Sequence, residues 1–345
     1  MDDIEPPSNS PIDLTDRGDL ILNIHDVNRL KRSSFVVSSH ILTMASPVFA
    51  AMLDPKFKEG QQLLQSREQN AAEKPIILLE EDDVDAMDFI LSSLHYKTDR
   101  IKHDLGAQAI AEIAVQSDKY DFHGVLVPWI KLWCHPDRFP VRPSHKVRDM
   151  GYGLLVAYLF QSPDFVAVSA SYAKTLPPDF ATSWRTSKFM SRLPKVIEVQ
   201  LASEITRAQK EIRLQVLSKM DELQPKNNPC TVDRSRSHLV QYLDVLKHFD
   251  IWPSLVLFDT SSPSDLVSLI QGLPRAPNPV CLRYQLPQCP LRVAITELCR
   301  AVCTIRDNME GVPLSMVVGA SDESGNDSSD DIVNKVTKSV STRVE

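Results

Sequence analysis

Cysteine and histidine are the side chains in this sequence with the clearest potential for metal chemistry. The C-terminal half carries a set that could bind zinc, namely Cys230, His238, Cys281, Cys289, Cys299 and Cys303. Structural zinc sites use four such ligands, usually in pairs separated by two to four residues. No CxxC pair occurs, and Cys299 and Cys303 lie one helical turn apart, which is ordinary core spacing. The spacing favours buried free thiols, so we expect no metal and no cofactor.

Sequence motifs of nucleophilic or phosphate chemistry are also missing. The chain has no GxSxG elbow, no P-loop, no HExxH and no GxGxxG. Cys134 and His135 are adjacent, but adjacency in sequence does not create a thiolate–imidazole pair in space. We therefore expect no enzyme, with a site assembled from distant residues of the C-terminal region as the minor alternative.

Length and composition indicate a two-domain protein of mildly acidic character. The chain has 345 residues, a formal charge of −7 and 43% hydrophobic residues. This charge disfavours nucleic acid and anionic membranes as partners. The N-terminus lacks the features of a secretory signal, and no apolar run is long enough to span a bilayer. We expect an intracellular protein of the cytoplasm or nucleus, not secreted, with reduced thiols and protein partners.

The elements of the first third follow from the stretch "FVVSSHILTMASPVFAAML". A strand over residues 19–24 and a second strand ending at residues 35–37 precede a short helix over residues 40–45. Ser46 then caps another helix, in which Pro47 takes the first position, where its missing N–H costs nothing. This break explains why an apolar segment contains Ser-Pro.

Further elements alternate between strand and helix before the pattern becomes helical. A third strand covers residues 75–82 and is followed by a helix that Asp82 or Asp83 caps. Helices over residues 105–119 and 125–134 follow, and Pro128 is expected at the entry of the second. The clearest later helix covers residues 195–223; packing on its neighbours is favoured over a coiled coil, because strict heptads are not sustained.

The domain boundaries follow composition. Residues 1–16 and 319–345 are predicted to be disordered tails, because they are rich in polar residues and poor in aromatic ones. Residues 17–135 form the first domain, and the proline-dense segment 136–149 is the predicted linker. Residues 150–318 form a helical C-terminal region.

Residues 17–135 resemble the BTB/POZ domain. The resemblance rests on "GDLILNI" with its leading Asp19, on the strand–helix signature that contains His40, Ser46, Pro47 and Phe49, on "FKEG" and on "SDKYDF". It implies an α+β fold, a small mixed sheet with a helical cluster, followed here by an all-α C-terminal region. The layout is similar to fungal BTB proteins with a helical C-terminal extension and no kelch, MATH or zinc-finger module.

The resemblance implies a protein–protein interaction module that forms homodimers through its first strand and first helices. The residues implied for this interface are Leu20, Leu22, Ile41, Leu42 and Met44. Some family members are substrate adaptors that recruit a cullin ubiquitin-ligase scaffold through an apolar-x-Glu motif and use an extra helical pair after the BTB core. Phe57 and Glu59 fit that motif. The alternatives are that Phe57 packs on its own helix beside a solvated Glu59, and that the protein is a nuclear or transcription-associated scaffold without a ligase.

His40 occupies a position where the family also has a histidine. A basic residue often follows that histidine and joins the leading aspartate in a charged groove, but Ile41 follows here. A local structural role for His40 near the start of its helix is therefore favoured over a charged groove or a catalytic role.

Overall fold

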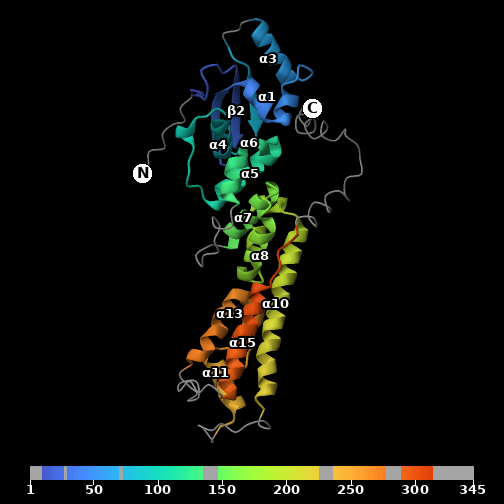
Figure 1. Cartoon of the computed structure of the whole chain (residues 1–345). Helices are drawn as coiled ribbons and strands as arrows, with labels where there is room; N and C mark the ends of the chain where they lie inside the picture. The colour runs from blue at the N-terminus through green and yellow to red at the C-terminus, as the bar shows by residue number, and fades with distance from the viewer. Residues whose placement is uncertain are drawn as a thin grey trace.

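The computed structural model describes residues 10–26, 29–69, 73–134, 147–224, 236–276 and 289–313. The fold is mixed α+β, as the sequence predicts, with one small sheet and many helices. Figure 1 shows an elongated molecule that has the sheet at one end, α7 and α8 in the middle and a group of helices at the other end.

The sheet has four strands in the order β1-β3-β2-β4. β2 and β3 are antiparallel, whereas β1 runs parallel to β3 and β4 runs parallel to β2. Leu20, Leu22 and Ile24 of β2 share the buried face, which the period-two pattern predicts. The strands are β1 (Ile12–Asp13), β2 (Leu20–Asp26), β3 (Lys31–Val37) and β4 (Ile76–Glu80).

Strand β1 corrects the expected disorder of residues 1–16. Ile12 pairs with Phe35 and Asp13 pairs with Val36 in β3. Leu14 follows β1 and is fully buried. Burial of one leucine side chain is worth about 1.5–3 kcal/mol, enough to order a short segment against an existing strand. Residues 1–9 lie outside the described part of the chain.

Helices α1 to α6 accompany the sheet in the first part of the described chain, and the break at Ser-Pro is confirmed. Ser38 Oγ accepts a hydrogen bond from Ile41 N at the start of α1, and Ser46 Oγ accepts one from Phe49 N at the start of α2. Pro47 is the first residue of α2. These helices are α1 (Ser39–Ala45), α2 (Pro47–Met52), α3 (Lys58–Glu68), α4 (Val84–Leu94), α5 (Ala107–Tyr120) and α6 (His123–Trp133).

The start of α6 differs from the prediction. The helix begins at His123, so Pro128 lies inside it and not at its entry. A proline inside a helix leaves the carbonyl four residues earlier without its N–H partner. Here that carbonyl belongs to Gly124, an exposed residue. Water can therefore replace the lost hydrogen bond, which explains why the helix continues through the proline.

The rest of the described chain is helical, in agreement with the prediction. The helix predicted over residues 195–223 is confirmed as α10. The helices are α7 (Val147–Leu159), α8 (Phe165–Thr175), α9 (Phe180–Arg185), α10 (Lys195–Glu222), α11 (His238–His248), α12 (Leu257–Thr260), α13 (Pro263–Gly272) and α15 (Pro290–Asp307), with short 3-10 turns η1 (Thr98–Arg100), η2 (Lys188–Arg192) and η4 (Leu273–Arg275).

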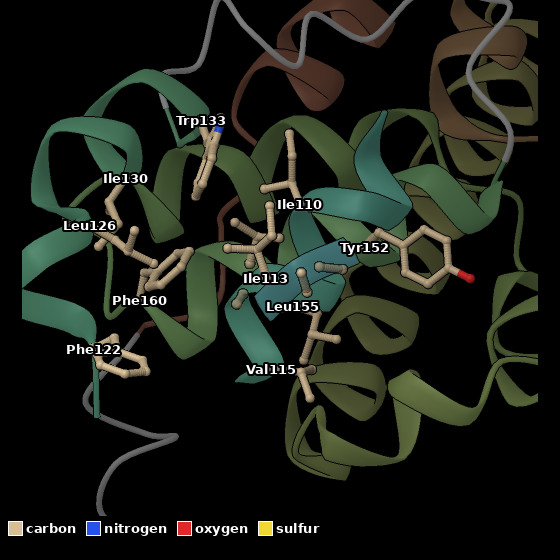
Figure 2. Packing of buried hydrophobic residues seen from close by; sticks show 14 of the residues in the cluster. Ile110, Ile113, Val115, Phe122, Leu126, Ile130, Trp133, Tyr152, Leu155 and Phe160 are labelled. Atoms are coloured by element: carbon tan, nitrogen blue, oxygen red, sulfur yellow. The ribbon is translucent and has the colours of Figure 1, made fainter. Parts of the chain in front are cut away.

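The predicted linker does not separate two cores. Residues 135–146 lie outside the described part, and residues 147–149 already belong to α7. Helix α7 packs directly on α5, and the Trp133 and Phe160 rings stack with their centroids 6.1 Å apart. Figure 2 shows side chains of α5, α6 and α7 gathered in one cluster. The first core therefore continues from the sheet into the helical region.

Helix α10 joins this first core to a second one. Its Ile197, Leu201 and Ile205 belong to the first core, whereas Ile212 and Val216 belong to the second, which α11, α13 and α15 complete. At 28 residues the helix is about 42 Å long.

The outward side of α10 does not carry the apolar stripe of a coiled coil. Its strongly exposed large apolar residues are Val199 and Leu214, two positions far apart along the helix. Packing on both cores, and not coiled-coil pairing, accounts for its buried residues.

Candidate interaction surface

Asp19 is the centre of a polar cluster that joins three elements. Its carboxylate accepts hydrogen bonds from Ser39 N and Ser39 Oγ in α1, both at 2.8 Å, and from Arg67 Nη2 in α3 at 2.7 Å. Partial burial raises the pKa of Asp19, but the hydrogen bonds from Ser39 and Arg67 outweigh it and leave the pKa below its usual value. Arg67 thus supplies the positive charge that the residue after His40 does not.

His95 is a buried histidine with a structural role, which sequence reasoning missed. His40 is exposed on α1. His95 is buried at the end of α4, where its Nε2 accepts a hydrogen bond from Ser38 N at 3.0 Å and its Nδ1 lies 2.8 Å from Leu91 O. These partners assign the proton of a neutral ring to Nδ1. Burial lowers the pKa of His95, although the Leu91 hydrogen bond acts in the opposite direction.

Ser46 and Phe49 hold α2 against the end of α5, whereas Pro47 between them is exposed. Besides capping α2, Ser46 Oγ donates a hydrogen bond to Tyr120 O. The fully buried Phe49 ring lies 5.0 Å from the Tyr120 ring and 5.7 Å from the Phe122 ring, measured between centroids. The "ASPVF" and "KYDF" segments therefore contact each other, and both have packing roles.

A partly buried ionic network, in which the carboxylates are buried and Arg29 is exposed, lies at the other end of the sheet. Arg29 bonds the carboxylate of Glu112 in α5 and lies 2.8 Å from Asp83, the N-cap of α4. Burial raises the pKa of Asp83 and of Glu112, partly offset by Arg29. The network fastens the β2–β3 connection to α4 and α5. Sequence reasoning missed it, because partners so distant in the chain leave no periodic signal.

Asp82 forms a second buried charge cluster beside this network. It is fully buried, receives a hydrogen bond from Lys119 Nζ at 2.5 Å and another from the Tyr120 hydroxyl. Both donors belong to the "SDKYDF" segment: its lysine balances the charge of the buried carboxylate, and its tyrosine donates a hydrogen bond to it.

The cysteines and histidine considered for zinc do not form a site in the described residues. Cys230 and Cys281 lie outside them. Cys289 Sγ lies 3.8 Å from His238 Nε2, whereas Cys299 Sγ donates to Ile270 O. Within the described ranges no three His, Cys, Asp or Glu side chains are placed to hold a metal ion.

Cys134, the cysteine considered for catalysis, is buried after α6. Burial is the main cause that raises its pKa to about 11, so the thiol stays protonated at neutral pH. His135, its neighbour in sequence, lies outside the described part.

Phe57 and Glu59 lie together at the start of α3. Phe57 is the residue before the helix, Glu59 is in its first turn, and both are half-buried. Gly60 is packed so closely against the preceding turn that a Cβ atom there would lie 2.2 Å from Asp54 O. This close contact fixes the turn and therefore the direction in which Phe57 and Glu59 are presented.

The residues implied for a dimer interface divide into two groups. Leu20, Leu22 and Leu42 have no exposed surface, so we correct the expected interface by removing their side chains from it. Their burial follows from the sheet and α1 forming one core. Ile41 is half-buried and Met44 is 76% exposed, so these two remain accessible on α1.

No family model matches the chain, and no curated protein matches it. In the helices that the structure describes, none combines the length and apolarity that crossing a bilayer requires.

Proposed function

We propose that this protein is a non-enzymatic interaction protein of the BTB/POZ type and acts as a substrate adaptor of a cullin ubiquitin ligase. The observation that carries the proposal is the accessible Phe57–Glu59 segment on a fixed turn before α3. An apolar ring beside a carboxylate has the composition of a small binding hot spot. Met44 and Ile41 on α1 supply an apolar surface for self-association.

The position of α7 and α8 supports the adaptor role. Adaptors of this family use a helical pair directly after the BTB core. Here α7 packs on α5 and α8 packs on α7, so a helical pair follows the sheet and its helices within one core. A partner that contacts the start of α3 would meet a rigid body.

The second core supports the other half of an adaptor's task, which is to hold a substrate. It forms around the far half of α10, away from the sheet (Figure 1). Its surface therefore lies at the opposite end of the molecule from α3, the helix that Phe57 precedes (Figure 1). Two partners can bind at the two ends without competing for the same residues.

Isothermal titration of the full chain against the N-terminal domain of the host's BTB-binding cullin tests this proposal. We expect micromolar or tighter binding by the wild type. Phe57→Ala and Glu59→Gln should each weaken binding by about 1–3 kcal/mol, because each removes one hot-spot contact.

Glu68→Gln is the matched control, because it removes the same charge from the exposed last turn of α3. It should bind as the wild type does. The adaptor role is wrong if the folded chain gives no heat with the cullin domain, or if Phe57→Ala and Glu59→Gln bind like Glu68→Gln.

A further inference from the structure

Strand β4 presents apolar side chains to solvent at an edge of the sheet. It is the last strand in the order β1-β3-β2-β4. Ile77 and Leu79 point into the core, whereas Ile76 is 59% exposed and Leu78 is 54% exposed on the opposite face. Natural sheets usually protect their edges, because an exposed apolar edge strand is a template for pairing with another strand.

The unpaired backbone groups of β4 belong to these same exposed residues. Pro75 O accepts a hydrogen bond from Ile21 N, and Glu81 N donates one to His25 O, so the odd-numbered residues of β4 face β2. Peptide groups alternate in direction along a strand, so the N–H and C=O groups of Ile76 and Leu78 point away from β2. Within the described ranges, no strand pairs with that side of β4.

The charges at the two ends of this segment are opposite. Lys74 precedes the strand, Glu80 ends it, and both side chains are exposed. Both residues are even-numbered, so their backbone groups also face the free edge. The free edge therefore presents, in order, a cation, two apolar side chains and an anion.

Two copies of this edge are complementary in the antiparallel orientation. When a two-fold axis passes through Ile77, Ile76 lies opposite Leu78 of the second copy, and Lys74 lies opposite Glu80 of the second copy. Each contact occurs twice, as a two-fold interface requires. A parallel arrangement would instead place Lys74 against Lys74, and a shift by two residues would place Ile76 against Glu80. Directly opposed pairs of opposite charge stabilise a sheet, and like charges destabilise it.

We propose that β4 is a self-association edge, at which two copies of this chain pair antiparallel through residues 74–80 and join their four-stranded sheets into one. Pro75 does not obstruct this pairing, because its missing N–H would point toward β2. The edge uses no residue of α1 or α3. It is thus a second self-association surface, independent of the one on α1.

Sedimentation equilibrium of the full chain over the micromolar range, with charge-swap variants, tests the proposal. Lys74→Glu places two carboxylates opposite each other twice, and Glu80→Lys does the same with two ammonium groups. We expect each single variant to raise the dissociation constant about tenfold or more, because attraction becomes repulsion at both ends of the interface. The double variant K74E/E80K should restore the constant to within about threefold of the wild type, because each new pair is again of opposite charge.

A mixture of two single-cysteine variants tests the register. Ile76→Cys and Leu78→Cys chains, mixed and oxidised, should form a disulfide between residues 76 and 78 of different chains, identified by peptide mass mapping. Each variant alone should not link through its new cysteine, because residue 78 lies diagonally from residue 78 of the second copy. The distance between opposed Cα atoms in such a pair, about 5.5 Å, suits a disulfide.

Three results would overturn the proposal. The first is a monomer throughout the concentration range. The second is a dimer whose constant both single charge variants leave unchanged, which would place self-association elsewhere, for example on α1. The third is a loss of association in the single variants that the double variant does not restore.

Discussion

At the scale of single residues, the polar groups of this protein act by joining elements. Asp19 and Arg67 connect β2 to α3 across 48 positions of sequence, and His95 connects α4 to the start of α1. Each contact satisfies a partly buried group that would otherwise reduce stability. His95 has a measurable pH signature near neutrality, because the hydrogen bond that its Nε2 accepts from Ser38 N requires the neutral ring.

We expect the stability of the fold to fall as the pH drops below 6.5, in part through His95. Its pKa in the folded protein is below the usual 6.5, so below pH 6.5 the unfolded chain binds this proton more readily than the folded one. Protonation also removes the acceptor for Ser38 N, a bond worth about 0.5–1.5 kcal/mol. His95→Gln should therefore show a smaller decrease in melting temperature between pH 7.5 and 5.5 than the wild type.

His40→Gln is the control for this measurement, since it removes an exposed histidine next to the same helix start. Its pH profile should follow that of the wild type. Identical profiles for His95→Gln and the wild type would show that His95 does not contribute to the acid sensitivity.

At the scale of elements, the helices and strands that depend on local sequence were predicted correctly, whereas those that depend on contacts between distant segments were not. The Ser-Pro break and the residues of α10 follow from capping and periodicity, and both are confirmed. β1 was missed because a two-residue strand has no period, and its pairing with β3 becomes visible only in space. Proline density predicted a linker, although the apolar residues of α7 pack on α5 immediately after that segment.

The candidate sites also separate into those that a contiguous motif predicts and those that depend on distant segments. The start of α3 and the exposed part of α1 could be selected from sequence motifs, because those motifs are contiguous. Arg67, His95 and the Arg29 network could not, because each depends on partners from separate elements. The burial of Leu20, Leu22 and Leu42 likewise requires knowing which face of each element meets the core.

Ser46→Ala should be a costly substitution for a single hydroxyl. It removes the cap of α2, worth about 1 kcal/mol. It also leaves the buried Tyr120 carbonyl without this donor, at about 1–3 kcal/mol. We expect a total loss of about 2–4 kcal/mol, measured as the shift of the thermal unfolding transition. Ser237→Ala removes a cap from α11 at a half-buried position, where we expect no additional buried carbonyl to lose its donor, so it should cost only about 1 kcal/mol. Equal shifts in the two variants would contradict the additional role of Ser46.

At the scale of the whole molecule, two cores share one chain that crosses between them twice. Helix α10 leaves the first core for the second, and the segment after α15 returns, where Val312 N donates a hydrogen bond to Ser169 Oγ in α8. The sheet and the helices α7 and α8 belong to the first core together. We therefore expect two cooperative unfolding units, with their boundary at the middle of α10 and not at the predicted linker.

Paired leucine truncations test where stability divides. Leu155 in α7 and Leu298 in α15 are both fully buried, and Leu→Ala at such sites costs about 2–5 kcal/mol. Leu155→Ala should lower the hydrogen-exchange protection of β2 and α5 as well as α7, because they share the first core. Leu298→Ala should lower protection mainly in α11, α13 and α15. If Leu155→Ala left β2 unchanged, the first core would not be one cooperative unit.

The continuity of α10 also sets the rotational phase between the two ends of the protein. An α-helix turns by about 100° and advances about 1.5 Å per residue. Helix α10 is part of both cores, with Ala208 in the first and Ile212 in the second. The number of residues between these two positions therefore affects the angle, about the helix axis, between the second core and the sheet. One inserted residue there would rotate one end by more than a quarter turn while changing the separation hardly at all. The residue count of α10 is therefore one determinant of the direction in which the far end points, besides the packing of α8 on α13.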